Sequence, residues 1–111
     1  MVKRASGAST DAIATRVLID ARSKKRVTVK LWAPVEEAEE EWSCAFHITG
    51  MRKPERAFGI DAFQALGMAL EGIKVRLRER GGTYTWRGGE QGDAGFPQMI
   101  LLLQRTRSEN R

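Results

Sequence analysis

Residues 61 to 79 carry the apolar periodicity of one long amphipathic helix, and this stretch constrains the fold more than any other. Large apolar residues recur there at spacings of three and four, which is the period of an α-helix: Phe63, Leu66, Leu70, Ile73 and Leu77. At ~1.5 Å per residue the helix would be about 28 Å long, close to the width of a small domain. A helix with one apolar side must bury that side, so we expect it to cross the face of a second layer.

Both boundaries of this helix are marked in the sequence. Asp61 occupies the position of an N-cap, and Gln64 follows three residues later, which is the spacing of a capping box. Gly81 and Gly82 are typical of a helix end. Anions also bind at helix N-termini, but capping accounts for Asp61 and Gln64 without any ligand. We therefore interpret these two residues as a helix cap.

Alternating apolar and polar residues predict strands before the helix. The strand segments are 13–21, 27–32, 42–50 and a short 56–60. In the clearest of them, Trp42, Cys44, Phe46 and Ile48 share one side. We interpret the Glu-rich residues 36–41 as a solvated loop or a short helical turn. Residues 83–86 form a short strand candidate, 88–95 a loop, and 98–104 either a strand or a helix.

These elements predict an α+β fold, because strands precede a helix without βαβ alternation. We expect an antiparallel β-meander of three to four strands, with one long helix packed across it and one or two short C-terminal elements. The 111 residues suffice for one domain. We place that domain at residues 13–104, with a flexible N-terminal arm at 1–12 and a flexible basic tail at 105–111.

The charge of the chain is segregated along the sequence. The net charge is +5, yet residues 16–30 hold six basic residues against one acidic, and residues 36–41 hold five glutamates. The predicted first hairpin ends in a basic tip, which is the best candidate for nucleic-acid contact: Arg22, Lys24, Lys25 and Arg26. No aromatic residue is interleaved with them as a stacking platform. We favour a tip that is solvated or pairs with the Glu-rich segment.

Nucleophilic, metal and cofactor chemistry find little support in the sequence. One Cys and one His exclude a Cys-only or multi-His metal site. Cys44 and His47 lie three apart on a strand and should point to opposite faces, so they should not form a nucleophile–base pair. The glycines of 88–95 lack the ending of a phosphate loop. We predict no catalytic residue, no cofactor and no metal, and we lean against an enzyme.

The remaining apolar features of the sequence indicate where the protein is located and what it contacts. The longest apolar run, 99–103, is too short to span a membrane, and the N-terminus has no secretory apolar region, so we expect a cytoplasmic protein. Three apolar residues off the main packing positions are candidates for an interface with a protein partner: Trp32, Met68 and Val75.

Three functions stay open at this point. The first is a non-catalytic protein-interaction or accessory module, for which a homodimer is one form of interaction. The second is nucleic-acid binding through the basic tip. The third is a small-molecule or enzymatic site between sheet and helix, near His47, Asp61 or Trp86.

Several short motifs carry a resemblance to a known family. They are Trp42-x-Cys44-x-Phe46-x-Ile48-x-Gly50, Gly59-Ile60-Asp61-x-Phe63-Gln64-Ala65-Leu66, Trp86, and Gly95-Phe96-Pro97. In this arrangement the chain resembles a family of small bacterial proteins of unknown function, over about residues 13–97. That family has no established activity, so the resemblance implies consistency of fold and no chemistry.

Overall fold

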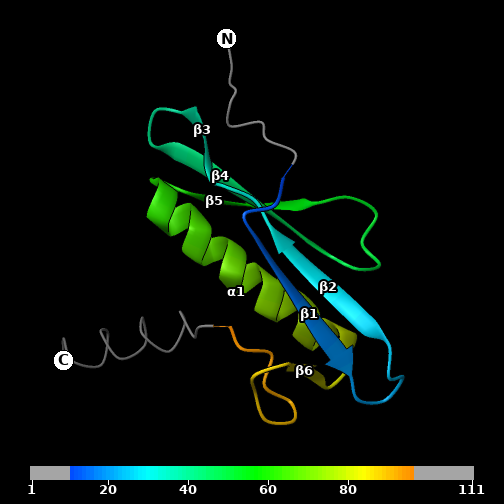
Figure 1. Ribbon diagram of the computed structural model, residues 1–111. Coiled ribbons are helices and arrows are strands. Elements are labelled where there is room, and N and C mark those ends of the chain that lie inside the picture. The colour runs from blue at the N-terminus through cyan, green and yellow to red at the C-terminus, as the bar shows by residue number, and fades with distance from the viewer. Residues whose placement is uncertain (1–10, 97–111) are drawn as a thin grey trace, which may run out of the picture.

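The fold is a six-stranded antiparallel sheet with one long helix on one of its faces (Figure 1). It is seen in a computed structural model that describes residues 11–96. The elements are β1 (Ala14–Asp20), β2 (Arg26–Leu31), β3 (Val35–Ala38), β4 (Glu41–Ile48), β5 (Glu55–Gly59), α1 (Ala62–Arg80) and β6 (Tyr84–Trp86). The predicted α+β class is confirmed, but three to four strands was too few.

One of the extra strands, β3, arises where we predicted a loop or turn, and the other, β6, is the short strand candidate at 83–86, which joins the same sheet. Most of the Glu-rich segment is strand rather than loop: β3 pairs with β4, Glu36 lies opposite Trp42, and Glu39 and Glu40 form the turn between the two strands. Glutamate is a poor strand former, but an edge strand is stabilised mainly by its backbone ladder and leaves the charged side chains in solvent. The three residues of β6 form a strand because they pair with β1.

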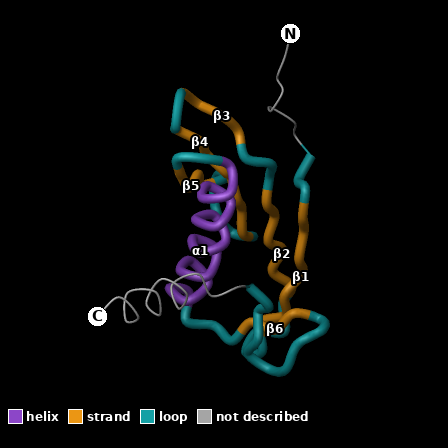
Figure 2. The backbone as a smooth tube through the Cα atoms, turned by 90° about the vertical axis from the view of Figure 1, so that its left-hand side faces the viewer, coloured by secondary structure: helices purple, strands orange, loops and turns teal. Residues whose placement is uncertain are grey.

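The first five strands form a meander, and the helix then leads the chain to the sixth strand at the other edge of the sheet. Strands β2 and β3 follow one another along one edge of β4, and Trp32 N between them donates to Ala45 O at 3.0 Å. Strand β5 pairs with the other edge of β4. Helix α1 then runs back along the sheet and delivers β6 to the far side of β1 (Figures 1 and 2). The β3–β4 and β1–β2 hairpins therefore lie at opposite ends of the molecule.

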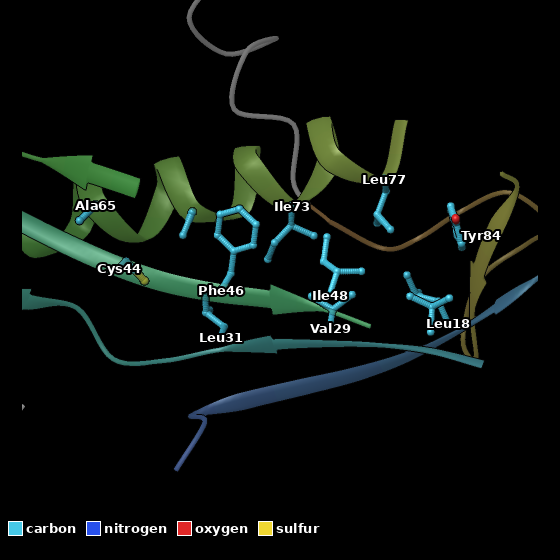
Figure 3. Close-up of a cluster of buried hydrophobic side chains, with 12 residues drawn as sticks. Leu18, Val29, Leu31, Cys44, Phe46, Ile48, Ala65, Ile73, Leu77 and Tyr84 are labelled. Carbon is cyan, nitrogen blue, oxygen red and sulfur yellow. The ribbon is translucent and has the colours of Figure 1, made fainter. Parts of the chain in front are cut away.

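The core lies between α1 and one face of the sheet (Figure 3). The helix buries Ala65, Ala69, Ile73 and Leu77, which recur every four residues. Of the predicted apolar stripe, Ile73 and Leu77 are buried and Leu66 and Leu70 are half-buried, but Phe63 is 86% exposed. Alanine rather than phenylalanine faces the sheet near the helix start because the backbones approach closely there.

Two glycines permit this close approach. A Cβ on Gly59 would lie 2.4 Å from Ala65 N, and one on Gly72 would lie 2.9 Å from the Phe46 ring. The helix axis therefore sits closer to β4 and β5 than large side chains would allow. The apolar period locates the helix correctly but misplaces its buried side by part of a turn.

Among residues 11–96, no helix lies over the opposite face of the sheet. In β1, Leu18 is fully buried beneath α1, whereas Val17 and Ile19 on the other face are each 41% exposed. Alternation by itself predicted the strand but did not show which side packs. We call this second side the uncovered face. The predictions for residues 98–104 and 105–111, and most of the predicted arm 1–12, lie outside the described residues.

The helix ends are fixed by hydrogen bonds at the positions that the sequence singled out. Asp61 is the N-cap, and its Oδ1 accepts from Gln64 N at 2.8 Å. Gln64 Oε1 accepts from Ile60 N at 2.8 Å. At the other end, Gly81 has φ 74° and donates to Arg78 O, the left-handed geometry that glycine adopts without strain.

A bidentate ion pair ties α1 to β5 and leads to a pH prediction. Arg76 Nε and Nη2 donate to the two Glu55 oxygens at 2.8 and 2.7 Å. Hydrogen bonds from Arg76 lower the pKa of Glu55. A lowered carboxylate pKa stabilises the fold at neutral pH, and this contribution disappears as pH falls through the folded-state pKa. We expect Glu55→Gln to reduce the free energy of unfolding in urea at neutral pH but not in acid.

Glu79→Gln is the matched control for Glu55→Gln. Glu79 also pairs with Arg76, at 2.9 Å, but lies within the helix and is 58% exposed. Its removal breaks no link between helix and sheet, so we expect a smaller effect. An equal loss of stability from both variants at neutral pH would contradict a tethering role for Glu55.

Candidate functional site

The basic tip is an ordered turn rather than a loose loop. Asp20 accepts from Arg22 N at 3.2 Å and from Ser23 Oγ at 2.9 Å. These hydrogen bonds, the first one above all, lower the pKa of Asp20. Lys24 adopts a left-handed backbone, with φ 64°. The four residues proposed for nucleic-acid contact are all exposed here: Arg22, Lys24, Lys25 and Arg26.

The glutamates that we expected to neutralise this tip lie elsewhere. We define the acidic hairpin as the β3–β4 turn with the exposed residues Glu36, Glu39, Glu40 and Glu41. It occupies the end of the sheet opposite the basic tip (Figure 1). A path of about a dozen extended residues separates them, on the order of 40 Å. The interpretation in which the basic tip pairs with the Glu-rich segment of the same chain is therefore wrong. The fifth glutamate, Glu37, pairs instead with Arg56.

An open hollow lies on the uncovered face next to the basic tip. Its volume is about 630 Å³, and we call it the basic hollow. Val17 and Ile19 of β1 are its apolar residues, and Arg26 and Arg87 are its charged ones. The remaining described residues that line it are Thr85, Trp86 and Gly89. The register explains this grouping, because Ile19 lies between Arg26 of β2 and Thr85 of β6.

Trp86 forms one wall of the basic hollow, and Arg16 holds its ring in place. The Arg16 guanidinium lies 4.3 Å from the centre of the Trp86 ring, a cation–π distance. Arg16 also donates to Gly95 O at 2.6 Å and thereby fixes the loop that follows β6. Gly88 and Gly89 come so close to the Trp86 ring that a Cβ on either would lie 2.4 Å from it. Trp86 is thus fixed in place before any ligand arrives.

The other end of the molecule exposes three large apolar side chains. Phe58, Ile60 and Phe63 are 52%, 62% and 86% exposed. They fall within six residues, where β5 passes into α1, and we call them the apolar corner. Phe58 lies opposite Ser43 on the uncovered face, whereas Phe63 lies on α1, so the corner wraps around the edge of the sheet. The acidic hairpin lies beside it, because Trp42 at the start of β4 pairs with Gly59. Helical spacing assigned Phe63 to the core, so sequence reasoning missed this surface.

The residues predicted as an interface do not come together. Trp32 follows β2 and is opposite Ala45, which places it on the uncovered face. Met68, which is 44% exposed, and the half-buried Val75 lie on α1, on the other layer. A single surface cannot include all three, because the sheet separates them.

The predicted ligand site between sheet and helix is not assembled either. His47 Nε2 lies 2.9 Å from Met51 O, so it donates to this loop carbonyl. Asp61 is occupied as the helix cap. A groove of about 210 Å³ does run between β1 and α1, but Arg16 is its one charged lining residue in the described part of the chain. No group of three metal-ligating side chains occurs among residues 11–96.

Cys44 is buried among the core side chains, and we predict that its thiol is inert in the folded protein. Burial raises the pKa of Cys44 to about 11, and its Sγ lies 3.2 Å from Trp32 O. At pH 8 we expect the native thiol to react with an aromatic disulfide reagent about 100-fold more slowly than in urea. The absorbance of the released thiolate measures both rates, and equal rates would contradict a buried thiol.

Residues 14–98 match the family described as a domain of unknown function (DUF6968). The chain belongs to this family. The matched region of DUF6968 includes the Trp42 strand, the helix start at Asp61 and Phe96, the segments on which the expected resemblance rests. No curated protein and no solved structure matches the chain. Among the described residues of this DUF6968 protein, no helix is long and apolar enough to cross a membrane.

Proposed function

We propose that this DUF6968 protein is a non-catalytic protein-interaction module whose docking surface is the apolar corner. The exposure of Phe63 carries this proposal. Burying a phenylalanine side chain gains about 1.5–3 kcal/mol, and the fold leaves nearly all of that gain unused at residue 63. Clustered apolar side chains at the surface are typical of protein–protein contact sites.

The apolar corner is well suited to docking because its backbone is already fixed. The cap hydrogen bonds of Asp61 and Gln64 hold the first turn of α1, and Gly59 packs against that turn. A partner would therefore find Ile60 and Phe63 on a rigid support, which lowers the entropic cost of binding.

The β5 strand beside the corner offers a second means of contact. Within the described residues it pairs only with β4, so its other edge has no strand partner. Proteins usually protect such an edge with lysine or proline, but β5 reads Glu-Arg-Ala-Phe-Gly and exposes Phe58. Backbone pairing at an edge adds affinity where apolar side chains supply the anchor.

A photo-crosslinking experiment tests this function in the cells that produce the protein. A photoactivatable phenylalanine analogue at Phe63 should form a discrete crosslinked protein species. Met68 is the matched control, because it is also exposed but lies farther along α1, away from the corner. Crosslinks of equal yield at both positions, or none at Phe63, would remove the corner as a docking surface.

A further inference from the structure

The two ends of this molecule are complementary in charge. One end joins the apolar corner to the acidic hairpin, and the other joins the basic hollow to the basic tip. Each end carries charge that is left without a counterpart nearby. The sheet holds the ends apart, since β2 and β3 run in line along β4. A single chain therefore cannot satisfy this complementarity within itself.

The arginines of the basic hollow are available to a partner. The ion pairs between described residues involve Arg56, Lys74 and Arg76, and they leave out Arg26 and Arg87. No acidic side chain is among the described residues that line the hollow. Val17 and Ile19 between the two arginines offer apolar surface. The matching ligand is an acidic segment that also presents an apolar or aromatic side chain.

We propose that this ligand is a second copy of the same chain, running antiparallel to the first. The acidic hairpin and apolar corner of each copy would meet the basic hollow and basic tip of the other. This inference rests on the proposed function and names the partner of the apolar corner.

The symmetry of the arrangement favours a closed dimer. Two antiparallel copies form the same contact twice, so the interface is isologous and leaves no end free for further growth. Phe58 at the corner lies opposite Ser43 and therefore on the uncovered face, where it supplies an aromatic ring that a guanidinium can bind by a cation–π contact. The glutamates of the hairpin supply carboxylates, which arginine binds in a bidentate manner. The opposite end of the folded molecule thus supplies both the carboxylates and the aromatic ring that the basic hollow requires.

A charge exchange between two variants tests this dimer. The first variant carries Arg26→Glu and Arg87→Glu, which reverses the charge of the two arginines that line the basic hollow. The second carries Glu36→Lys and Glu39→Lys, which reverses the charge of two of the four glutamates of the acidic hairpin. All four residues are exposed, so the substitutions should leave the fold intact, which circular dichroism checks. Sedimentation velocity over a range of concentrations then measures self-association of each variant and of their equimolar mixture.

We expect each variant alone to self-associate at least about tenfold more weakly than the wild type, because like charges now face each other. The mixture should recover association, since both contacts of the mixed dimer again join opposite charges. Wild-type association should also weaken as salt rises. Recovery in the mixture is the decisive result, because a mere loss of stability cannot produce it.

Three outcomes would overturn the inference. A wild type that stays monomeric while Phe63 crosslinks to another protein leaves the proposed function in place and removes the second copy as partner. Self-association that the mixture fails to recover assigns the dimer to another surface. Salt-sensitive binding of a single-stranded oligonucleotide by a monomeric wild type, lost with Arg26→Glu and Arg87→Glu, would assign the basic hollow to nucleic acid instead.

Discussion

Replacing Phe46 by alanine is expected to lower the free energy of unfolding by about 3–5 kcal/mol, the usual cost of deleting a large buried aromatic ring. Phe46 is 1% exposed and lies at the centre of β4, opposite Leu31 of β2. Its ring points at α1 and touches the backbone of the helix at Gly72 (Figure 3). The cavity would open between two layers that the backbone holds in place, so little relaxation can fill it.

Phe58→Ala is the matched control for this prediction. It removes the same side chain from the neighbouring strand, but Phe58 is 52% exposed. We expect a loss of less than about 1 kcal/mol for this surface position. Urea unfolding followed by circular dichroism measures both variants. Similar losses from Phe46→Ala and Phe58→Ala would show that the core is not centred on β4.

Gly59→Ala is expected to be the second most damaging substitution, with a loss of about 3 kcal/mol, at the upper end of the range for overpacking. The added Cβ would lie 2.4 Å from Ala65 N and 2.8 Å from both the carbonyl carbon and the Cβ of Gln64. These atoms belong to the capped first turn of α1, which cannot move without breaking the Asp61 and Ile60 hydrogen bonds. No small movement of the backbone can therefore relieve the clash.

Gly72→Ala provides the comparison. Its new Cβ would lie 2.9 Å from Phe46 Cε2, which is the edge of a side-chain ring rather than backbone. Alanine also favours a helix over glycine by about 1 kcal/mol, which offsets part of the strain. We expect Gly72→Ala to cost clearly less than Gly59→Ala in thermal unfolding. The reverse order would mean that the helix start, and not the Phe46 ring, adapts to a larger residue.

Local signals in the sequence predicted the elements whose formation depends on nearby residues. The helix, its Asp61–Gln64 cap and its end at Gly81 follow from side chains within a few residues of one another. The alternation of Cys44, Phe46 and Ile48 predicted the central strand and its buried side. The separation of Cys44 from His47 also followed from the period of two.

The strand β3, and the distant partner of the strand candidate at 83–86, could not be predicted in this way. The three residues of β6 gain their backbone hydrogen bonds from β1, more than sixty residues earlier. Strand β3 forms because β4 folds back on it, despite two glutamates in its four residues. Local propensity is weak at β3, where the ladder supplied by β4 outweighs it, whereas the Tyr-Thr-Trp of β6 favours a strand.

The candidate site depended on the same distant pairing. The chain order shows a basic block followed by an acidic block, and it suggested that the two neutralise each other. Strand β2 continues into β3 without reversing, so the sheet carries the two blocks to opposite ends. The basic hollow joins Arg26 to Arg87 across β1, a meeting that no spacing along the sequence indicates.

The sequence by itself determined the α+β class, the helix with its cap, the central strand and the placement of Cys44 and His47 on opposite faces of that strand. Each rests on a period or a cap set by residues close in the chain. Only the tertiary structure decided that Phe63 faces solvent, that Val17 and Ile19 lie on the uncovered face, and that the charged blocks lie far apart. Burial depends on how closely two layers approach, and here the glycines at 59 and 72 set that distance.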